Sequence, residues 1–293
     1  MDFKLLRSTA RLSKSELRSR PSDPMNPFLK GKASSASPLQ LVVLGCLTAL
    51  PLTALCAESA APADAPITPY RPSVSSPAQL SAVGQVEMEV GGLRQRSGGT
   101  RRDSLPVQLK LAFSPEWAVL LGGEAQVAMR DGAASASGVG DTTVVLKRAW
   151  AVDDATGFGL ELVAKLATAK DSIGSGKTDT ALNAIYSKDL GAVHMDANLN
   201  FTRLGAVDAD SGRIQTGLSA SFSTPLNAQW GCTVELSGTR RSGADSSRQI
   251  LGALSYSPSK RLTFDIGVAR AAKPTPGATS VFAGVVFPVA VLC

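Results

Sequence analysis

The sequence predicts an all-β protein: a transmembrane, antiparallel, up-and-down β-barrel of about 12 strands. Three observations support this prediction: apolar and polar residues alternate in short segments, longer and shorter connections alternate between those segments, and the chain begins with an export signal. Residues 192–204 show the alternation best, because Leu199 and Phe201 fall on one face of a strand while Asp196 and Asn198 fall on the other. Such a strand has one apolar face and one polar face.

The first 57 residues have the features of a leader. Two lysines precede an apolar run over residues 41–55, which is too short for a transmembrane helix of about 20 residues but suits a signal peptide. We therefore expect residues 1–57 to be an N-terminal extension and signal peptide, cleaved after Ala57. A lipoprotein signal ending at Cys46 is the alternative, and Met25 is a second candidate start.

Residues 58–83 are rich in Ala, Pro and Ser and show no periodicity, which predicts a disordered periplasmic linker. Residues 84–293 form the predicted barrel. Without the leader the chain has 22 basic and 21 acidic residues, a net charge of +1, so the basic pI gives no support to nucleic-acid binding. Cys232 and Cys293 lack metal-ligand spacing and do not indicate a disulfide framework, although pairing between them stays open.

Strand segments of a length that crosses a tilted barrel wall recur along the predicted barrel. They are 84–96, 105–113, 117–130, 141–152, 157–169, 179–188, 192–204, 213–223, 228–240, 248–256, 261–271 and 279–291. Aromatic residues that lie close to the shorter turns predict an interfacial girdle. These are Trp117, Trp150, Phe158, Trp230 and Tyr256.

The connections divide into two kinds, which is the asymmetry of an outer-membrane barrel with both termini in the periplasm. The longer ones are SGGTRRDS, DGAASASGVG, KDSIGSGKT, GAVDADSG, SGADSS and KPTPGA, and the shorter ones are SPE, DDAT, DLG, TPLN and SPSK. We therefore expect Ser135, Gly174 and Ala244 at the cell surface, and Pro115 and Asp189 in the periplasm.

Charged and amide residues recur at mid-strand on the polar face. In a water-filled lumen these side chains would be hydrated and could form ion pairs. The predicted lumen-lining residues are Lys110, Glu124, Glu161, Lys165, Asn183, Asp196, Asn198, Glu235 and Asp265. Because both signs occur, we expect a mixed-sign network in which Glu161 and Asp196 pair with Lys165. A narrow lumen filled in this way predicts low basal conductance and weak ion selectivity.

Three other patterns point to sharper chemistry, and we prefer a structural interpretation of each. The GSGKT at residues 174–178 matches part of the motif of a phosphate-binding loop, but neither the full motif nor a following helix is present. His194 and Asp196 with Ser219 or Ser221 would suggest a lipase, yet these positions face the predicted lumen. The loop aspartates lack an EF-hand spacing. We therefore expect no catalytic residues, no metal and no cofactor.

Several short motifs resemble the family named for the MetA pathway of phenol degradation. They are Gly140-Asp141-Thr142, Ala164-Lys165-Leu166-Ala167-Thr168, Gly174-Ser175-Gly176-Lys177-Thr178-Asp179 and Ser187-Lys188-Asp189-Leu190-Gly191. The similar rhythm covers most of residues 84–287. The chain departs from the family at 167–169, where Ala-Thr-Ala replaces an expected Pro-Thr-Gly, and it continues past Phe287. Since members are outer-membrane barrels described as transporters, the resemblance implies passage of small hydrophobic or aromatic solutes.

The sequence thus predicts an exported barrel of a Gram-negative outer membrane that is not an enzyme. Its expected function is passive passage of a small solute, and its expected partners are outer-membrane lipid and the outer-membrane assembly machinery. The alternative is a non-transporting barrel with a structural or surface-binding role. Connections of only about six to ten residues disfavour surface binding.

Overall fold

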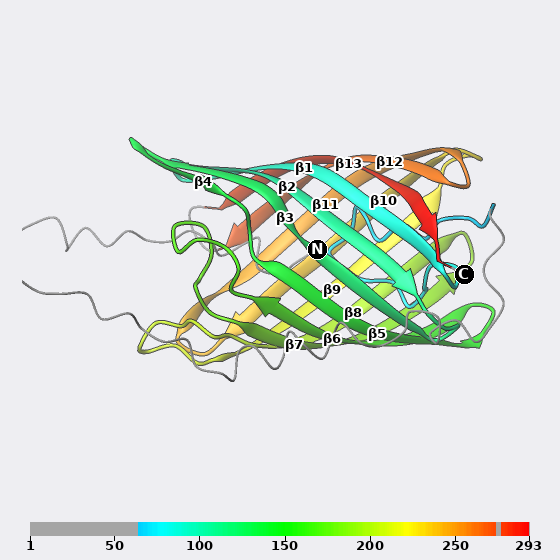
Figure 1. The fold of residues 1–293 in the computed structure, drawn as a ribbon, viewed down its shortest axis with the longest axis horizontal. Helices are drawn as coiled ribbons and strands as arrows, with labels where there is room; N and C mark the ends of the chain where they lie inside the picture. Colours follow the sequence, from blue (N-terminus) through cyan, green and yellow to red (C-terminus); the bar gives the residue numbers. More distant parts are fainter. Residues whose placement is uncertain (1–63, 274–276, 293) are drawn as a thin grey trace, which may run out of the picture.

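A closed antiparallel barrel dominates the computed structural model, which describes residues 64–273 and 277–292 (Figure 1). The strands are β1 (Gln85–Ser97), β2 (Thr100–Ala112), β3 (Trp117–Asp131), β4 (Ala134–Gly138), β5 (Thr142–Asp153), β6 (Thr156–Leu166), β7 (Asp179–Leu190), β8 (Val193–Arg203), β9 (Ile214–Pro225), β10 (Trp230–Arg241), β11 (Ala244–Ser259), β12 (Leu262–Lys273) and β13 (Ala278–Val291). Among the described residues, none lies in a helix that could cross a membrane.

Twelve of the strands form the wall, since β1 pairs with both β2 and β13, and β3 pairs directly with β5. The remaining strand, β4, folds back on the far end of β3 outside the ring of twelve. The predicted fold class, a 12-strand antiparallel barrel, is confirmed. Closure satisfies the backbone hydrogen bonds of every wall strand, which a surface in lipid requires.

The two ends of the barrel differ. We call the end that carries the start of β1 and the end of β13 the turn end, and the opposite end the loop end. Aromatic side chains cluster at the turn end, where Trp230 and Tyr256 have ring centroids 4.8 Å apart and Phe158 and Tyr186 are 5.2 Å apart. Apolar side chains cover the outer wall between the two ends, as Leu199 on β8 illustrates. Such a belt suits contact with lipid.

Three of the connections predicted to be longer loops are largely strand, so the difference between the two ends is smaller than the sequence predicted. β1 passes to β2 through Gly98 and Gly99, β3 to β4 through Gly132 and Ala133, and β10 to β11 through Ser242 and Gly243. The glycines at 98, 132 and 243 have φ values of 57°, 57° and 66°, which tight hairpin turns require. Among the fully described connections that were predicted to be longer loops, only those at 167–178 and 204–213 are loops, and both are slightly longer than predicted.

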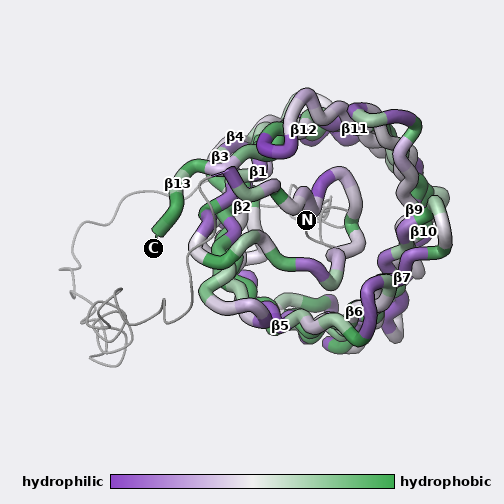
Figure 2. The backbone as a smooth tube through the Cα atoms, turned by 90° about the vertical axis from the view of Figure 1, so that its right-hand side faces the viewer, coloured by the Kyte–Doolittle hydropathy of each residue, from purple (hydrophilic) through white to green (hydrophobic). Residues whose placement is uncertain are grey.

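Residues 65–82 lie inside the barrel (Figure 2). The prediction of a disordered periplasmic linker is therefore wrong for these residues, while residues 58–63 and the predicted leader at 1–57 lie outside the described part of the chain. The segment has no regular secondary structure, so its backbone polar groups depend on partners in the wall.

Candidate functional site: the occupied lumen

The chain crosses the inside of the barrel before it enters β1, and we call residues 65–82 the lumen segment. It begins at the turn end, where the Ile67 amide donates to the Lys260 carbonyl at 2.9 Å. It then follows the inner wall past β12, β10, β8 and β7, and it returns to the turn end, where the Ser81 hydroxyl accepts from the Ala112 amide at 3.3 Å. The segment therefore forms a loop within the lumen.

Carboxylates of the wall accept the backbone N–H groups of the lumen segment. The Tyr70 amide donates to Glu89 at 2.8 Å, and the amides of Val74 and Ser75 both donate to Glu235, at 2.8 and 2.9 Å. Hydrogen bonds to ionised acceptors are stronger than those between neutral groups. The segment thus has polar partners in the wall although it pairs with no strand.

Uncharged wall residues complete this set of contacts. Asn198 accepts from the Ser76 amide at 2.8 Å and donates to the Ser76 carbonyl at 2.9 Å. The Ser187 hydroxyl accepts from the Ala78 amide at 2.8 Å. Because these partners come from β7 and β8, on the side of the barrel away from β1, the segment is fixed along its length and not only at its ends.

Arg71 joins the lumen segment to the wall through a buried ion pair. Its Nε and Nη2 atoms each donate to the Asp265 carboxylate at 2.9 Å, and the two side chains are 5% and 1% exposed. The guanidinium lies against Gly91 and Gly284, which face each other across β1 and β13, and a Cβ at either position would overlap it. Two glycines in register therefore make room for this bidentate pair.

Tyr70 lies between two buried lysines. The Nζ atoms of Lys110 and Lys147 are 4.1 and 4.0 Å from the centroid of its ring, within cation–π range. Burial, followed by the charges of Glu161 and Glu89, raises the pKa of the Tyr70 phenol well above its usual value, so the side chain stays neutral. The ring contributes contact to both ammonium groups without adding a charge.

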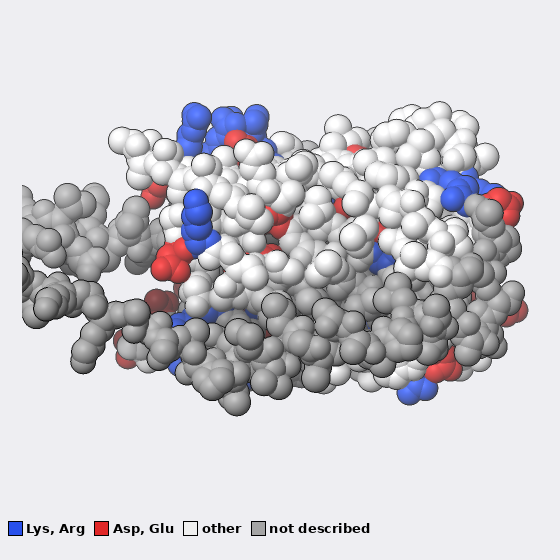
Figure 3. Space-filling model, in the orientation of Figure 1, with Lys and Arg blue, Asp and Glu red and all other residues white. Residues whose placement is uncertain are grey.

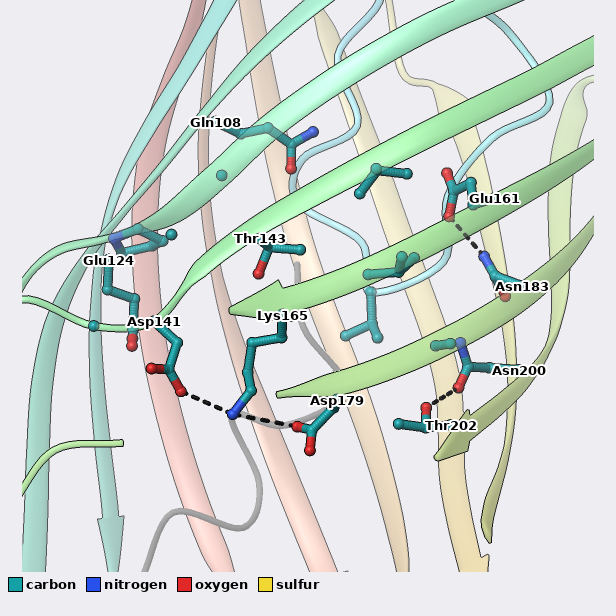
Figure 4. Close-up of a pocket in the computed structure, with 18 of the residues that line it drawn as sticks. Gln108, Glu124, Asp141, Thr143, Glu161, Lys165, Asp179, Asn183, Asn200 and Thr202 are labelled. Atoms are coloured by element: carbon teal, nitrogen blue, oxygen red, sulfur yellow. Dashed lines mark hydrogen bonds and ion pairs between the residues drawn. The ribbon is translucent and has the colours of Figure 1, made fainter. Parts of the chain in front are cut away.

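Above the lumen segment, toward the loop end, the barrel holds a cavity of about 750 Å³ (Figure 4). Its polar side includes Lys165, which pairs with Asp141 at 2.8 Å and with Asp179 at 3.3 Å. Arg102 pairs with Glu124 at 2.5 Å elsewhere on the same cavity wall. Acidic and basic groups are thus both present around the cavity.

An apolar strip interrupts this polar lining. Leu120 on β3 is in register with Val145 on β5, Val145 with Val163 on β6, and Val163 with Ala181 on β7, and all four line the cavity. Because residues in register project side by side from neighbouring strands, these side chains form a continuous band. The cavity therefore offers both an apolar surface and charged groups.

The structure places the predicted lumen-lining residues on the inner side of the wall. Lys110, Glu161, Lys165, Asn183, Asp196, Asn198, Glu235 and Asp265 are buried, and Glu124 is half-buried. Four of the nine, Glu124, Glu161, Lys165 and Asn183, line the cavity. Lys110, Asn198, Glu235 and Asp265 contact the lumen segment directly.

The expected pairing of Lys165 with Glu161 and Asp196 is wrong. Glu161 instead pairs with Lys147 at 3.2 Å, and Asp196 accepts from the Ser187 hydroxyl at 2.5 Å. The strand register explains the difference, because Lys147 lies directly opposite Glu161 whereas Lys165 lies directly opposite Asp179.

Sequence reasoning missed the residues that hold the lumen segment from its own side, above all Tyr70 and Arg71. It also left Glu87 and Glu89 out of the predicted site. One signal in the sequence was available: acidic residues outnumber basic ones on this part of the polar face. Lys110 forms ion pairs with both glutamates, at 3.1 and 2.6 Å. Where buried carboxylates outnumber the cations of the wall, the remaining carboxylates need hydrogen-bond donors from elsewhere in the chain.

Two other patterns noted in the sequence, His194 with Asp196 and the GSGKT motif, lie away from the cavity's charged pairs or in a loop. His194 contacts Asp189 at 2.5 Å through Nδ1 and Asp196 at 3.1 Å through Nε2, so both ring nitrogens face carboxylates. GSGKT lies in the loop at the loop end, before β7. Within the part of the chain that the structure describes, no three His, Cys, Asp or Glu side chains are grouped to hold a metal ion, and Cys232 forms no disulfide there.

Comparisons with known proteins agree on the fold. No family model and no curated protein sequence matches the chain. An outer membrane channel from Pseudomonas putida F1 is similar in structure, with a TM-score of 0.57 and 14% identity over 79% of this chain and 100% of that one. The NanC porin has a TM-score of 0.52 and 9% identity over 69% of this chain and 100% of that one. The chain therefore has the fold of outer-membrane porins and channels.

Proposed function

We propose that this protein is an outer-membrane channel for small solutes in which the lumen segment blocks the passage at rest. The observation that carries the proposal is the continuous set of hydrogen bonds between residues 65–82 and the inner wall. The closed barrel, its apolar outer belt and the fold shared with porins and channels support the placement in the membrane.

The solute that we propose is small and has both an apolar or aromatic part and a polar group. The apolar strip of Leu120, Val145, Val163 and Ala181 would contact the apolar part, while Lys165 and the acids beside it would contact the polar group. The resemblance to the family named for the MetA pathway of phenol degradation supports an aromatic solute. A relationship to that family is part of this proposal.

Planar-bilayer recordings test the proposal. We expect the intact protein to give low conductance, and a variant that lacks residues 64–78 to give a larger, steady conductance. Heat-modifiable mobility on gels would show that both barrels are folded. Adding phenol or a small benzoate should reduce the current through the shortened barrel.

Two outcomes would contradict the proposal. Equal conductance of the two folded barrels would mean that the lumen segment does not block the pore. No conductance in either barrel, together with unchanged solute uptake, would favour the structural or surface-binding alternative.

A further inference from the structure

A row of arginines crosses the outer surface of the barrel at the loop end. Arg96 on β1 lies opposite Arg101 on β2, and Arg101 lies opposite Arg130 on β3. All three side chains point away from the lumen, because side chains alternate along a strand and the neighbouring Arg102 points inward. Figure 3 shows basic side chains gathered at the upper left, over the loop end of β1, β2 and β3.

Two further arginines flank the row, and we call the five together the arginine patch: Arg94, Arg96, Arg101, Arg130 and Arg270. Thr279 on β13 connects the two sides, since it lies opposite Arg96 and also opposite Arg270, whose guanidinium donates to its hydroxyl. The patch therefore extends over five neighbouring strands, from β12 to β3.

The patch carries excess positive charge. Asp103 is an outward acid within the patch, and it pairs with Arg94 at 2.7 Å and with Arg101 at 2.5 Å. Arg96 and Arg130 form no ion pair with any residue that the structure describes. Like charges directly opposite each other on paired strands are destabilising, so an anion that bridges the row would relieve the repulsion.

The position of the patch indicates the kind of anion. On β12 the outward residues Phe264, Ile266 and Val268 belong to the apolar belt, and Arg270 follows as the next outward residue. On β1, Val90 belongs to the belt and Arg94 comes two outward positions later. The arginines thus begin where the apolar belt ends. Their side chains point outward from the barrel wall, at the depth expected for lipid headgroups.

The turn end lacks a comparable patch among the described residues. There Arg148 pairs with Glu116 at 2.8 Å, and Lys260 pairs with Asp64 at 2.6 Å. Each of these cations has an acidic partner. An anionic lipid is therefore expected at one end of the barrel only.

We propose that the arginine patch binds a lipid with phosphate groups in its headgroup, in the leaflet at the loop end. Arginine matches a phosphate with two parallel hydrogen bonds, and a cross-strand row provides several such donors at strand spacing. Basic clusters at a membrane surface attract anionic headgroups generally. The inference depends on the membrane placement proposed above, but not on transport.

Native mass spectrometry of the purified full-length barrel tests the inference. The probes are a lipid A that carries two phosphates, the same lipid without phosphates, and inorganic phosphate as a competitor. We expect Arg96→Gln, Arg101→Gln and Arg130→Gln in combination to weaken binding of the phosphorylated lipid roughly tenfold or more. The matched control replaces Arg203, Arg240 and Arg248, which also lie near the loop end but face Ile214, Thr216 and Gly238 across their strand pairs.

Four outcomes would overturn the inference, provided that both variants show heat-modifiable folding. They are unchanged lipid binding in the Arg96, Arg101 and Arg130 variant, an equal loss in the control, equal binding of the lipid without phosphates, and displacement by inorganic phosphate at the same concentration. The last outcome would indicate a site for free phosphate. Lipid binding by a barrel that never conducts would contradict the proposed transport function and leave this inference standing.

Discussion

Replacing Arg71 by alanine should weaken the attachment of the lumen segment more than any other single change within it. The substitution leaves Asp265 as a buried charge without its partner, and both side chains are at most 5% exposed in the intact pair. Removing one member of a buried ion pair typically costs about 3–5 kcal/mol. Since each 1.4 kcal/mol is about a factor of ten, the ratio of attached to detached segment should fall by roughly two to three and a half powers of ten.

Single-channel recording in planar bilayers measures this ratio through the fraction of time that the pore is open. We expect Arg71→Ala to open often while the intact protein stays closed. Gly91→Ala should have the same direction of effect, because the added Cβ would lie 2.5 Å from Arg71 Nη1 and displace the guanidinium from Asp265. Arg71 lies outside the wall, and Gly91→Ala keeps the backbone N–H and C=O groups of β1, so folding should persist in both variants.

Arg148→Ala is the matched control. Arg148 also forms an arginine–carboxylate pair, with Glu116, but on the outer surface, where both side chains are 47% exposed and such pairs contribute about 0–1 kcal/mol. Its conductance should equal that of the intact protein. If Arg71→Ala is also indistinguishable from the intact protein, the account of the Arg71–Asp265 anchor is incorrect.

Two further predictions concern the wall. Leu199→Arg should impair folding into membranes by about 2–4 kcal/mol, whereas Asn198→Arg should leave folding intact and disturb the hydrogen bonds of Asn198 with Ser76 and Asn183. Equal loss of heat-modifiable mobility would contradict the assignment of faces. Glu161→Gln should remove the acidic partner of Lys147 and loosen the lumen segment, which brief openings in bilayer recordings would report; a fully closed variant would show that this pair does not contribute.

The sequence predicted the wall well because the membrane imposes a strict pattern on it. Outward positions must be apolar over the belt, and most inward positions, such as Glu235 and Asp265, are polar, so alternation marks the strands. Beyond the apolar belt both faces of a strand are exposed to water, and the alternation of apolar and polar residues disappears. This is why the hairpin at Gly98 and the extra strand β4 were expected to be loops.

The lumen segment could not be predicted from local sequence. Its composition of Ala, Pro and Ser gives no periodicity, and its hydrogen bonds reach partners far along the chain; Ser75, for example, is 160 residues from Glu235. Only the arrangement of the wall brings those partners together. The inward apolar strip was missed for a related reason, since Val145 and Val163 lie in strands whose outward positions are apolar too.

A reversible cross-link tests most directly whether the lumen segment blocks the pore. The Ser75 hydroxyl donates to the Ser219 hydroxyl at 2.8 Å, so cysteines at both positions should form a disulfide between the segment and β9. The pair would be introduced into Arg71→Ala with Cys232 and Cys293 changed to serine. We predict a closed pore when this variant is oxidised and frequent openings after reduction; equal conductance in the two states, with the disulfide verified by mass spectrometry, would contradict the central claim.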